Sequence, residues 1–400
     1  MGLPGLTAAA VVVGGGPSGL TAALALASAG IDVALVARTA PSDNRTTALL
    51  ASSVAALETL AVWEDCRNHA APLAALRIVD ATQRLWRAPE ALFEAHEIGI
   101  DAFAWNIENR HLIAALEARA TGMPNLHRVA EDAAAVESRA DGVTVHTTGG
   151  TTIAAQLAVG ADGRNSLCRN AAGIAVQSQS YPQIALTYNV AHSRPHRDIS
   201  TEFHTEHGPF TIVPLPGDHS SIVCVVSEAD AQHMQSLSGD DLDRELERRS
   251  HSILGKISAN AGHGAFALVM ESARRFAAER IALVGEAAHR FPPIGAQGLN
   301  LGLRDAAAIA EIAADYRDDP GQPDAIDRYD RERRADIMSR TIAVDLLNRS
   351  LLSGFLPMQS LRGIGLHLLN TVGPLRRAMM REGVMPRAAQ PRLMRGEALS

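Results

Sequence analysis

The N-terminal part of the chain alternates between apolar runs and a glycine-rich turn. Residues 8–13 are continuously apolar, which is typical of a parallel strand buried on both faces. The glycine-rich segment 14–19 follows, and then residues 20–29, rich in Ala and Leu, predict a helix that ends at Gly30. Residues 31–37 are apolar again. The order strand, turn, helix, strand predicts a βαβ unit.

The remainder of the chain shows shorter patterns, some with the alternation typical of strands and some with the periodicity of helices. Alternation or short apolar runs predict strands within 72–100, a hairpin over 140–160 turned at Gly149-Gly150, and strands at 184–190, 210–215, 221–226 and 280–284. Helical periodicity predicts helices at 44–62, 110–120, 239–259 and 299–314, with helix and tail after residue 320. This order predicts an α/β protein in which a doubly wound domain is interrupted by a largely β domain.

The composition is that of a globular protein. Hydrophobic residues make up 46% of the 400 residues, and the formal net charge is −7. No basic run suggests a nucleic-acid partner. The three cysteines, Cys66, Cys168 and Cys224, have no metal-ligand spacing, so we expect no metal site and a reducing, cytoplasmic location. We find no secretory signal and no apolar run of about 18 residues, so we expect a soluble or peripheral protein.

The turn at 14–19 matches the dinucleotide-binding pattern G-x-G-x-x-G. In this pattern Gly14 permits the tight turn, Gly16 lets the backbone approach a pyrophosphate, and Gly19 lets helix and strand pack closely. The free N–H groups and the dipole at the helix N-terminus favour a bound diphosphate. Because a strand precedes the turn and a helix follows it, the context predicts dinucleotide binding.

One element of the fingerprint is absent. An acidic residue usually ends the second strand and holds a ribose hydroxyl, but here Ala37 occupies that place and Arg38 follows it. Arg38 is a candidate to stack on adenine or to meet a 2′-phosphate. A protein that binds NADP therefore stays an alternative on this observation.

Two later segments also follow apolar strands. The first, 160–166, contains Asp162 and Gly163, and the second runs from Gly285 to Ala306. In the second, Glu286 follows the end of a strand and is a candidate to accept hydrogen bonds from hydroxyl groups. A Pro/Gly-rich loop then opens the predicted helix 299–314, whose N-terminus would stabilise negative charge on a bound ring. His289 lies between them and is interpreted as a loop histidine, with a polar contact to the ligand as the alternative.

Together with the fingerprint, these segments resemble the flavoprotein aromatic hydroxylases, the class A FAD monooxygenases. Four further segments resemble the ubiquinone-biosynthesis hydroxylases within that group. They are 44–49 (like RTTAL), 106–110 (like VENR), 208–210 with 214–216 (like GPF and PLP) and 297–302 (like GQGLNLG). The resemblance covers residues 8 to about 370, and it departs from the family at Glu286, where Asp is usual.

The resemblance implies a para-hydroxybenzoate-hydroxylase-like fold. A Rossmann-like FAD-binding domain is expected to be interleaved with a β-sheet substrate domain, with a helical C-terminus. The expected boundaries are 1–72, 101–180 and 271–320 for the FAD-binding domain, 73–100 and 181–270 for the substrate domain, and 321–400 for the C-terminal helices and basic tail.

The resemblance also implies the chemistry. Proteins of this family reduce FAD, react it with O₂ to a flavin C4a-hydroperoxide, and transfer oxygen to an activated aromatic ring. The implied substrate is a prenylated phenol or quinone precursor, with NAD(P)H as the candidate electron donor. No catalytic side chain is identified, because the protein holds the flavin, excludes water and orients the ring. The implied cofactor-binding residues are Gly14, Gly16, Ser18, Gly19, Arg38, Arg45, Arg110, Asp162, Gly163, Gly285, Glu286, Pro293, Gly295, Gln297, Gly298, Leu299 and Asn300.

Three alternatives stay open. A flavin hydroxylase of a soluble phenol or polyketide fits the same segments. Arg38 favours an NAD(P)-dependent oxidoreductase without flavin, and the departures at Ala37 and Glu286 suit a non-catalytic flavoprotein of a biosynthetic complex.

The C-terminal tail allows two interpretations. Residues 371–400 carry six Arg and two Glu, so the tail is a candidate for peripheral contact with the inner membrane or with other ubiquinone-biosynthesis proteins. The alternative is a helix that covers the FAD-binding domain, followed by a frayed end.

Overall fold

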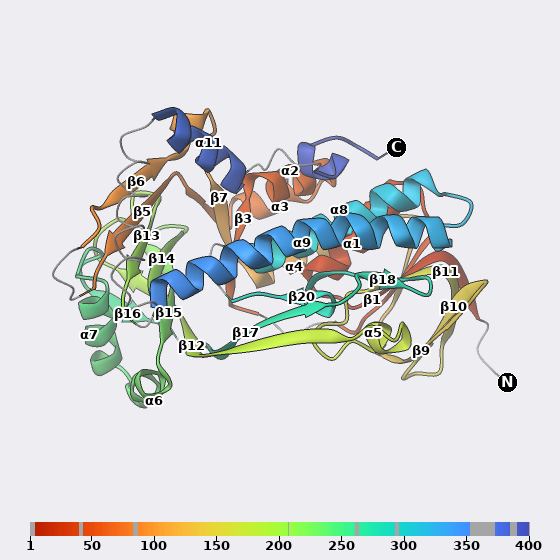
Figure 1. Cartoon of the computed structure of the whole chain (residues 1–400), viewed down its shortest axis with the longest axis horizontal. Helices are drawn as coiled ribbons and strands as arrows, with labels where there is room; N and C mark the ends of the chain where they lie inside the picture. Colours follow the sequence, from red (N-terminus) through yellow and green to blue (C-terminus); the bar gives the residue numbers. More distant parts are fainter. Residues whose placement is uncertain are drawn as a thin grey trace.

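Two large β-sheets occupy the two ends of an elongated molecule, with helices packed over them (Figure 1). The computed structural model describes residues 5–39, 43–82, 87–206, 208–260, 264–292, 296–352, 373–384 and 390–399. We call the sheet that contains the N-terminal strand the first sheet, and the other large one the second sheet. This mixed α/β architecture is the predicted fold class.

The first sheet is parallel at its centre. Its parallel strands, in spatial order, are β19 (Ile281–Leu283), β11 (Thr152–Gly160), β1 (Leu6–Val13), β2 (Val33–Val36) and β8 (Leu126–Val129). Antiparallel additions are β9 (Ala133–Arg139), β10 (Gly142–Thr147) and β18 (Ala277–Ala278). Val11 and Val12 are fully buried, which explains why this strand reads as a continuous apolar run.

Small side chains let helices pack closely on the first sheet. Helix α1 (Pro17–Ser28) packs against α4 (Asn109–Thr121) and α8 (Gln297–Asp315), and its Ala22, Ala23 and Ala25 are fully buried. The short helix α5 (Leu167–Ala171) follows β11. Helix α9 (Pro323–Leu352) packs on α8 and runs along the length of the molecule towards the second sheet (Figure 1). The parallel arrangement confirms the predicted βαβ unit.

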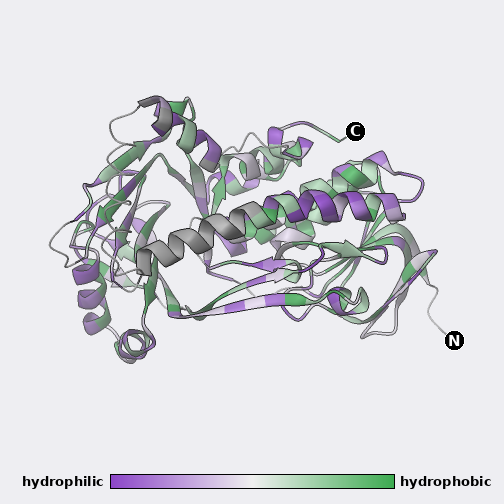
Figure 2. Ribbon diagram, in the orientation of Figure 1, coloured by the Kyte–Doolittle hydropathy of each residue, from purple (hydrophilic) through white to green (hydrophobic). Residues whose placement is uncertain are grey.

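The second sheet is covered by helices on one face. Its strands, in spatial order, are β20 (His289–Arg290), β17 (Gly264–Ala273), β12 (Val176–His192), β15 (His219–Val226), β14 (Pro209–Leu215), β13 (Ile199–His204), β5 (Ala75–Asp80) and β6 (Ala91–Glu94), and β16 (Ile257–Ala259) pairs with β12. Helices α6 (Glu228–Ser236) and α7 (Asp240–Arg249) contribute Met234 and Leu246 to a core with Phe210 and Ile222. Most residues of α7 are hydrophilic, as the purple colour of this helix in Figure 2 shows.

A small third sheet joins the two large ones. It consists of β3 (Thr46–Leu50), β7 (Ala104–Glu108) and β4 (Ala70–Leu73), accompanied by α2 (Ala51–Thr59), α3 (Trp63–Arg67) and the 3₁₀ turn η1 (Ala95–Ile98). Asn106 of β7 donates hydrogen bonds to the Pro214 carbonyl (2.9 Å) and the Ser221 hydroxyl (3.2 Å) of the second sheet. The long β12–β17 pair also extends from the second sheet towards the first (Figure 1).

Two helix predictions were wrong in part. Residues 46–50 of the predicted helix 44–62 form β3, because they pair with β7 across a large sequence separation. The predicted helix 239–259 stops at Arg249, where the backbone turns through His251 and Ser252 with φ of 52° and 53° before β16. In both places long-range pairing or a left-handed turn overrides the local helical pattern.

The end of the chain packs on helices α2 and α8. The 3₁₀ turn η3 (Arg392–Arg395) lies against α2 and α8, with Leu393 and Met394 buried. Helix α11 (Gly373–Val384) contacts η1, whereas residues 353–372 lie outside the described residues. Across the described ranges, no helix combines the length and apolar character needed to cross a bilayer.

Candidate functional site

The first glycine turn, between β1 and α1, requires glycine for two different reasons. Gly14 has a φ of +116°, and a Cβ there would collide with the carbonyl oxygen of Ala161. A Cβ on Gly19 would collide with the carbonyl oxygen of Gly14. By contrast, a Cβ on Gly16 would meet no atom within 4 Å. Gly14 and Gly19 therefore serve backbone packing, whereas Gly16 faces open space.

The helix N-terminus behind this turn has no side-chain cap. Gly16 is the N-cap residue of α1, Pro17 follows it, and the first turn contains no acidic side chain. Backbone N–H groups at a helix start need partners, and this sequence supplies none from a side chain. The arrangement suits an anion such as a diphosphate.

The second turn, after β11, is held by its own aspartate. The Ser166 hydroxyl donates to one oxygen of Asp162 (2.5 Å), and the Cys168 N–H donates to the other (3.1 Å). Gly163 has a φ of +75°, and a Cβ on it would meet nothing within 4 Å. The Asp162 side chain thus shapes the turn and the start of α5.

The third turn, the 3₁₀ segment η2 (Gly285–Ala287), meets the first turn at Ser18. A Cβ on Gly285 would lie 2.8 Å from the Ser18 hydroxyl oxygen, and one on Gly302 of α8 would collide with the same atom. Gly285 has a φ of +59°. Since Gly14 also touches Ala161, the structure brings three turns that are distant in sequence to one edge of the first sheet.

Glu286 is exposed and lies opposite the second turn. Its carboxylate is 3.8 Å from Nε of Arg164, and 58% of its side chain is accessible. Such an exposed ion pair contributes little stability, so the carboxylate stays available to other donors. The structure therefore places Glu286 in the space bordered by the second and third turns.

The side chain of Asn300, at the start of α8, is bonded entirely within the protein. Its Oδ1 accepts from the Leu50 N–H (2.9 Å) and the Ser53 hydroxyl (2.7 Å). Its Nδ2 donates to the carbonyls of Ala48 (2.8 Å) and Ala296 (2.6 Å). All four hydrogen-bonding positions of the amide are used, so this side chain ties α8 to β3 and α2. Any contact of Asn300 with a cofactor would therefore involve its backbone atoms.

The first turn of α8 is otherwise open. Ala296 is the N-cap residue with a φ of 54° and no side-chain cap, and no acidic residue follows in the first turn. Gln297, Gly298 and Leu299 begin the helix, and a Cβ on Gly298 would meet nothing within 4 Å. Pro293 and Gly295, which precede it, lie outside the described residues.

The three predicted arginines occupy different surroundings. Arg38 is 73% exposed and lies 3.5 Å from Asp132 at the end of β2. Arg45 forms a two-pronged pair with Asp43, which raises the pKa of the guanidinium, and the charge of Glu286 adds to this effect. Arg45 therefore lies within electrostatic reach of the third turn.

Arg110 lies at the edge of a polar cavity. Its guanidinium pairs with Glu108 (2.6 Å), and the cavity, of about 290 Å³, is also lined by the stacked rings of His69 and His111 (4.0 Å) and by His219. Most of the residues that line the cavity carry polar or charged side chains. Among the described residues, no contact joins Arg110 to the glycine turns.

Two groups near the turns escaped the sequence prediction. The first is Arg128 of β8, whose Nε donates to the Ala37 carbonyl (3.3 Å) and whose guanidinium lies 3.8 Å from the place of a Cβ on Gly15. Arg128 thus places a positive charge beside the first turn, close to Ala37, which occupies the position of the usual acidic residue. Only the pairing of β2 with β8 reveals it, so no local signal was available.

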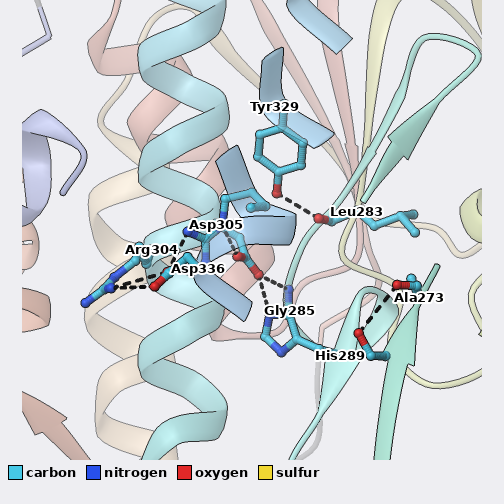
Figure 3. A network of polar contacts seen from close by, with 10 residues as sticks. Ala273, Leu283, Gly285, His289, Arg304, Asp305, Tyr329 and Asp336 are labelled. Carbon is cyan, nitrogen blue, oxygen red and sulfur yellow. Dashed lines mark hydrogen bonds and ion pairs between the residues drawn. The ribbon is translucent and has the colours of Figure 1, made fainter. Parts of the chain in front are cut away.

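The second is a buried ionic network behind the third turn (Figure 3). One oxygen of Asp305 accepts from the Gly285 N–H (3.1 Å) and contacts Nε2 of His289 (2.6 Å), and the other accepts from Nε of Arg333 (2.7 Å). Asp336 contacts both Arg333 (2.7 Å) and Arg304 (3.3 Å). The turn is therefore anchored to α8 and α9.

The ionisation of Asp305 follows from its neighbours. Burial alone would raise its pKa, but the His289 ring and the Arg333 guanidinium outweigh burial and hold the pKa of this carboxyl below its usual value. Behind the same turn, the Tyr329 hydroxyl donates to the Leu283 carbonyl (2.8 Å). His289 is thus a buried partner of a carboxylate, and not the backbone-bonded loop histidine expected.

The geometry fits a dinucleotide cofactor. The N-termini of α1 and α8 lack side-chain caps, and the positions of Gly16, Gly163 and Gly298 leave room for close approach to the backbone. In the part of the chain that the structure describes, no group of three or more His, Cys, Asp or Glu is arranged to hold a metal ion.

Comparison with known proteins gives consistent matches over nearly the whole chain. The model of a family described as FAD binding domain matches residues 7–342. A ubiquinone hydroxylase, UbiL, from Rhodospirillum rubrum is 33% identical over 97% of this chain and 93% of its own. The 3-demethoxyubiquinol 3-hydroxylase of Escherichia coli is 29% identical over 92% of this chain and 96% of its own.

Solved structures share the fold. The p-nitrophenol 4-monooxygenase PnpA of Pseudomonas putida superposes with a TM-score of 0.79 at 19% identity, covering 96% of this chain and all of its own. HpxO of Klebsiella pneumoniae, solved with FAD and uric acid, gives a TM-score of 0.74 at 19% identity and covers 95% of this chain and 97% of its own. At these identities the likeness concerns the fold.

Proposed function

Because the chain belongs to the FAD binding domain family, and within it to the FAD-dependent monooxygenases of the ubiquinone-hydroxylase type, we propose that it hydroxylates the ring of a prenylated phenol or quinone precursor in ubiquinone biosynthesis. The main support is the match to a relative named ubiquinone hydroxylase, which covers 97% of this chain and 93% of the relative. The three converging glycine turns support it.

The residues have distinct tasks in this proposal. Bound FAD supplies the activation of O₂ for transfer to the ring. The N–H groups at the start of α1 hold the diphosphate, with Gly16 allowing close approach. The carboxylate of Glu286 would accept from the ribitol hydroxyls, and Arg45, the residue before β3, would contact the cofactor. The N-terminus of α8 stabilises negative charge on the reduced flavin.

The substrate ring is proposed to lie against the face of the second sheet that α6 and α7 leave free. On β15, Ile222 and Cys224 face the core under these helices, so Ser221 and Val225 face the opposite way. That face carries a small apolar cluster of Ala185, Val225 and Leu268, and β7 lies against it through the Asn106–Ser221 contact. An apolar face excludes water and orients an aromatic ring.

The test combines quinone analysis with the purified protein. A deletion strain is expected to lose ubiquinone and accumulate a precursor that lacks one ring hydroxyl, and the wild-type gene is expected to restore ubiquinone. Substrate-dependent O₂ consumption, measured with NADH and with NADPH, identifies the electron donor. Unchanged ubiquinone in the deletion strain contradicts the proposed substrate, and hydroxylation of simple soluble phenols at comparable rates would point to the other class of flavin hydroxylase.

A further inference from the structure

Asp305 is a buried carboxylate that contacts the third turn on one side and a distant helix on the other (Figure 3). Its side chain is fully inaccessible. It accepts from the Gly285 N–H and contacts His289 through one oxygen, and it binds Arg333 of α9 through the other. A buried carboxylate is costly unless every side of it is satisfied, and here every side is.

Two arginines compensate the carboxylates of the network. Among the described contacts, Asp305 binds Arg333, and Asp336 binds both Arg333 and Arg304. Because Asp305 is ionised, Nε2 of His289 carries the proton and donates it to the carboxylate. Within the described residues Nδ1 of His289 is buried and has no hydrogen-bond partner, so the contact with Asp305 is the one that orients the ring.

The third turn has little freedom to move. Gly285 is in the left-handed region with a φ of +59°, and Ser18 of α1 lies against both Gly285 and Gly302. A small shift of Gly285 therefore changes its packing against Ser18 in the first turn. It also changes the direction of Glu286, the next residue.

We propose that Asp305 is a positioning residue for flavin binding: it fixes the Gly285–His289 turn against α1, and Arg333 compensates its charge. We rest this inference on the proposed placement of the flavin beside that turn. Asp305 itself touches no flavin atom, so its effect passes through Gly285 and His289. The expected signature is a change in flavin affinity and spectrum that exceeds the change in stability.

The variant Asp305→Asn tests the two-sided role. Asparagine offers an acceptor at one end and donors at the other, whereas Asp305 must accept at both ends. The NH₂ group of the asparagine therefore faces another hydrogen-bond donor, which is either the Gly285 N–H or the Arg333 guanidinium. We expect the dissociation constant of FAD to rise about tenfold to a hundredfold and the flavin absorption band to change shape.

A second variant restores the acceptor where it is needed. In Asp305→Asn/Arg333→Met the donor end of the amide no longer meets a guanidinium, so its oxygen can accept from Gly285. The double variant removes one charge of each sign and leaves the ion pair of Asp336 with Arg304 in place. We expect this double variant to regain most of the FAD affinity and the wild-type spectrum. It also carries the test if the single variant does not fold.

Asp330 provides a matched control. It is a buried aspartate on α9 that accepts from a backbone N–H, that of Phe276 (2.6 Å), and pairs with Arg334, but it contacts no flavin turn. We expect Asp330→Asn to lower the melting temperature and to leave FAD affinity within about twofold of wild type. Equal losses of affinity in Asp305→Asn and Asp330→Asn, or wild-type affinity in Asp305→Asn, overturn the inference.

A weakly binding double variant overturns it too, because the restored acceptor would then have no effect. None of these outcomes affects the proposed function, which fails instead if the wild-type protein takes up no FAD or if the deletion strain keeps its ubiquinone.

Discussion

Gly14 and Gly16 are two positions apart, yet the structure assigns them opposite sensitivities. An alanine at Gly14 would meet the Ala161 carbonyl and adopt a φ of +116°, so Gly14→Ala is expected to destabilise the apoprotein by about 1–3 kcal/mol or more. A Cβ at position 16 would meet no atom within 4 Å, and the φ of −73° there is one that alanine adopts readily. Gly16→Ala is therefore expected to leave apoprotein stability nearly unchanged. Urea unfolding of both apoproteins measures this difference.

The same pair separates folding from binding. The methyl group at position 16 would occupy the space proposed for the diphosphate, so Gly16→Ala is expected to weaken FAD binding although it folds normally. Titration of the apoprotein with FAD measures the loss. If Gly16→Ala binds FAD as wild type does, the diphosphate does not approach this part of the turn.

At the scale of elements, a feature could be predicted where neighbouring residues in the sequence determine it. The turns at Gly14, Gly163 and Gly285 were recognisable because their glycine patterns follow apolar strands directly. The contacts of Asn300 with Leu50 and of Asp305 with Arg333 join different segments of the chain, so no local pattern predicts them: the sequence motifs assign Asn300 to the cofactor and give Asp305 no role. For the same reason β3 was mistaken for helix: its partner strand lies in a different part of the sequence.

Helix α11 docks on the edge of the second sheet through one arginine. The Arg376 guanidinium binds both oxygens of Glu97 (2.7 and 2.6 Å), contacts the Leu92 carbonyl and stacks over Phe93 at 4.5 Å. Hydrogen bonding from Arg376 lowers the pKa of Glu97. Because the pKa is lowered on folding, this contribution is present above the ordinary value of 4.5 and is lost as the pH falls below it.

We therefore expect Arg376→Ala to cost about 1 kcal/mol of stability at pH 7 and progressively less below pH 4.5. Denaturant unfolding at both pH values measures the difference, and limited proteolysis reports whether α11 is released. Arg377→Ala is the matched control, because Arg377 is the exposed neighbour on the same helix. A difference between wild type and Arg376→Ala that persists unchanged at low pH would contradict the role of the Glu97 carboxylate.

At the scale of the whole molecule, the site depends on segments that the chain brings together from its beginning, middle and end. The first turn follows β1, the second follows β11 and the third follows β19, and these strands are neighbours in the first sheet. Helix α9 secures the third turn from behind through Arg333. A ligand that bridges the three turns therefore stabilises the folded state of the entire domain, since unfolding any one strand destroys the site.

This coupling gives a prediction that distinguishes the parts of the cofactor. FAD at about 1,000 times its dissociation constant is expected to stabilise the protein by about 4 kcal/mol. Riboflavin has the same ring but no diphosphate, so it cannot use the uncapped N-terminus of α1 and is expected to stabilise far less at the same concentration. Thermal unfolding of the apoprotein with each compound measures the two effects. Equal stabilisation by riboflavin and FAD would mean that the glycine turn at 14–19 does not hold the diphosphate, and the arrangement proposed for the site would have to be rebuilt around the ring alone.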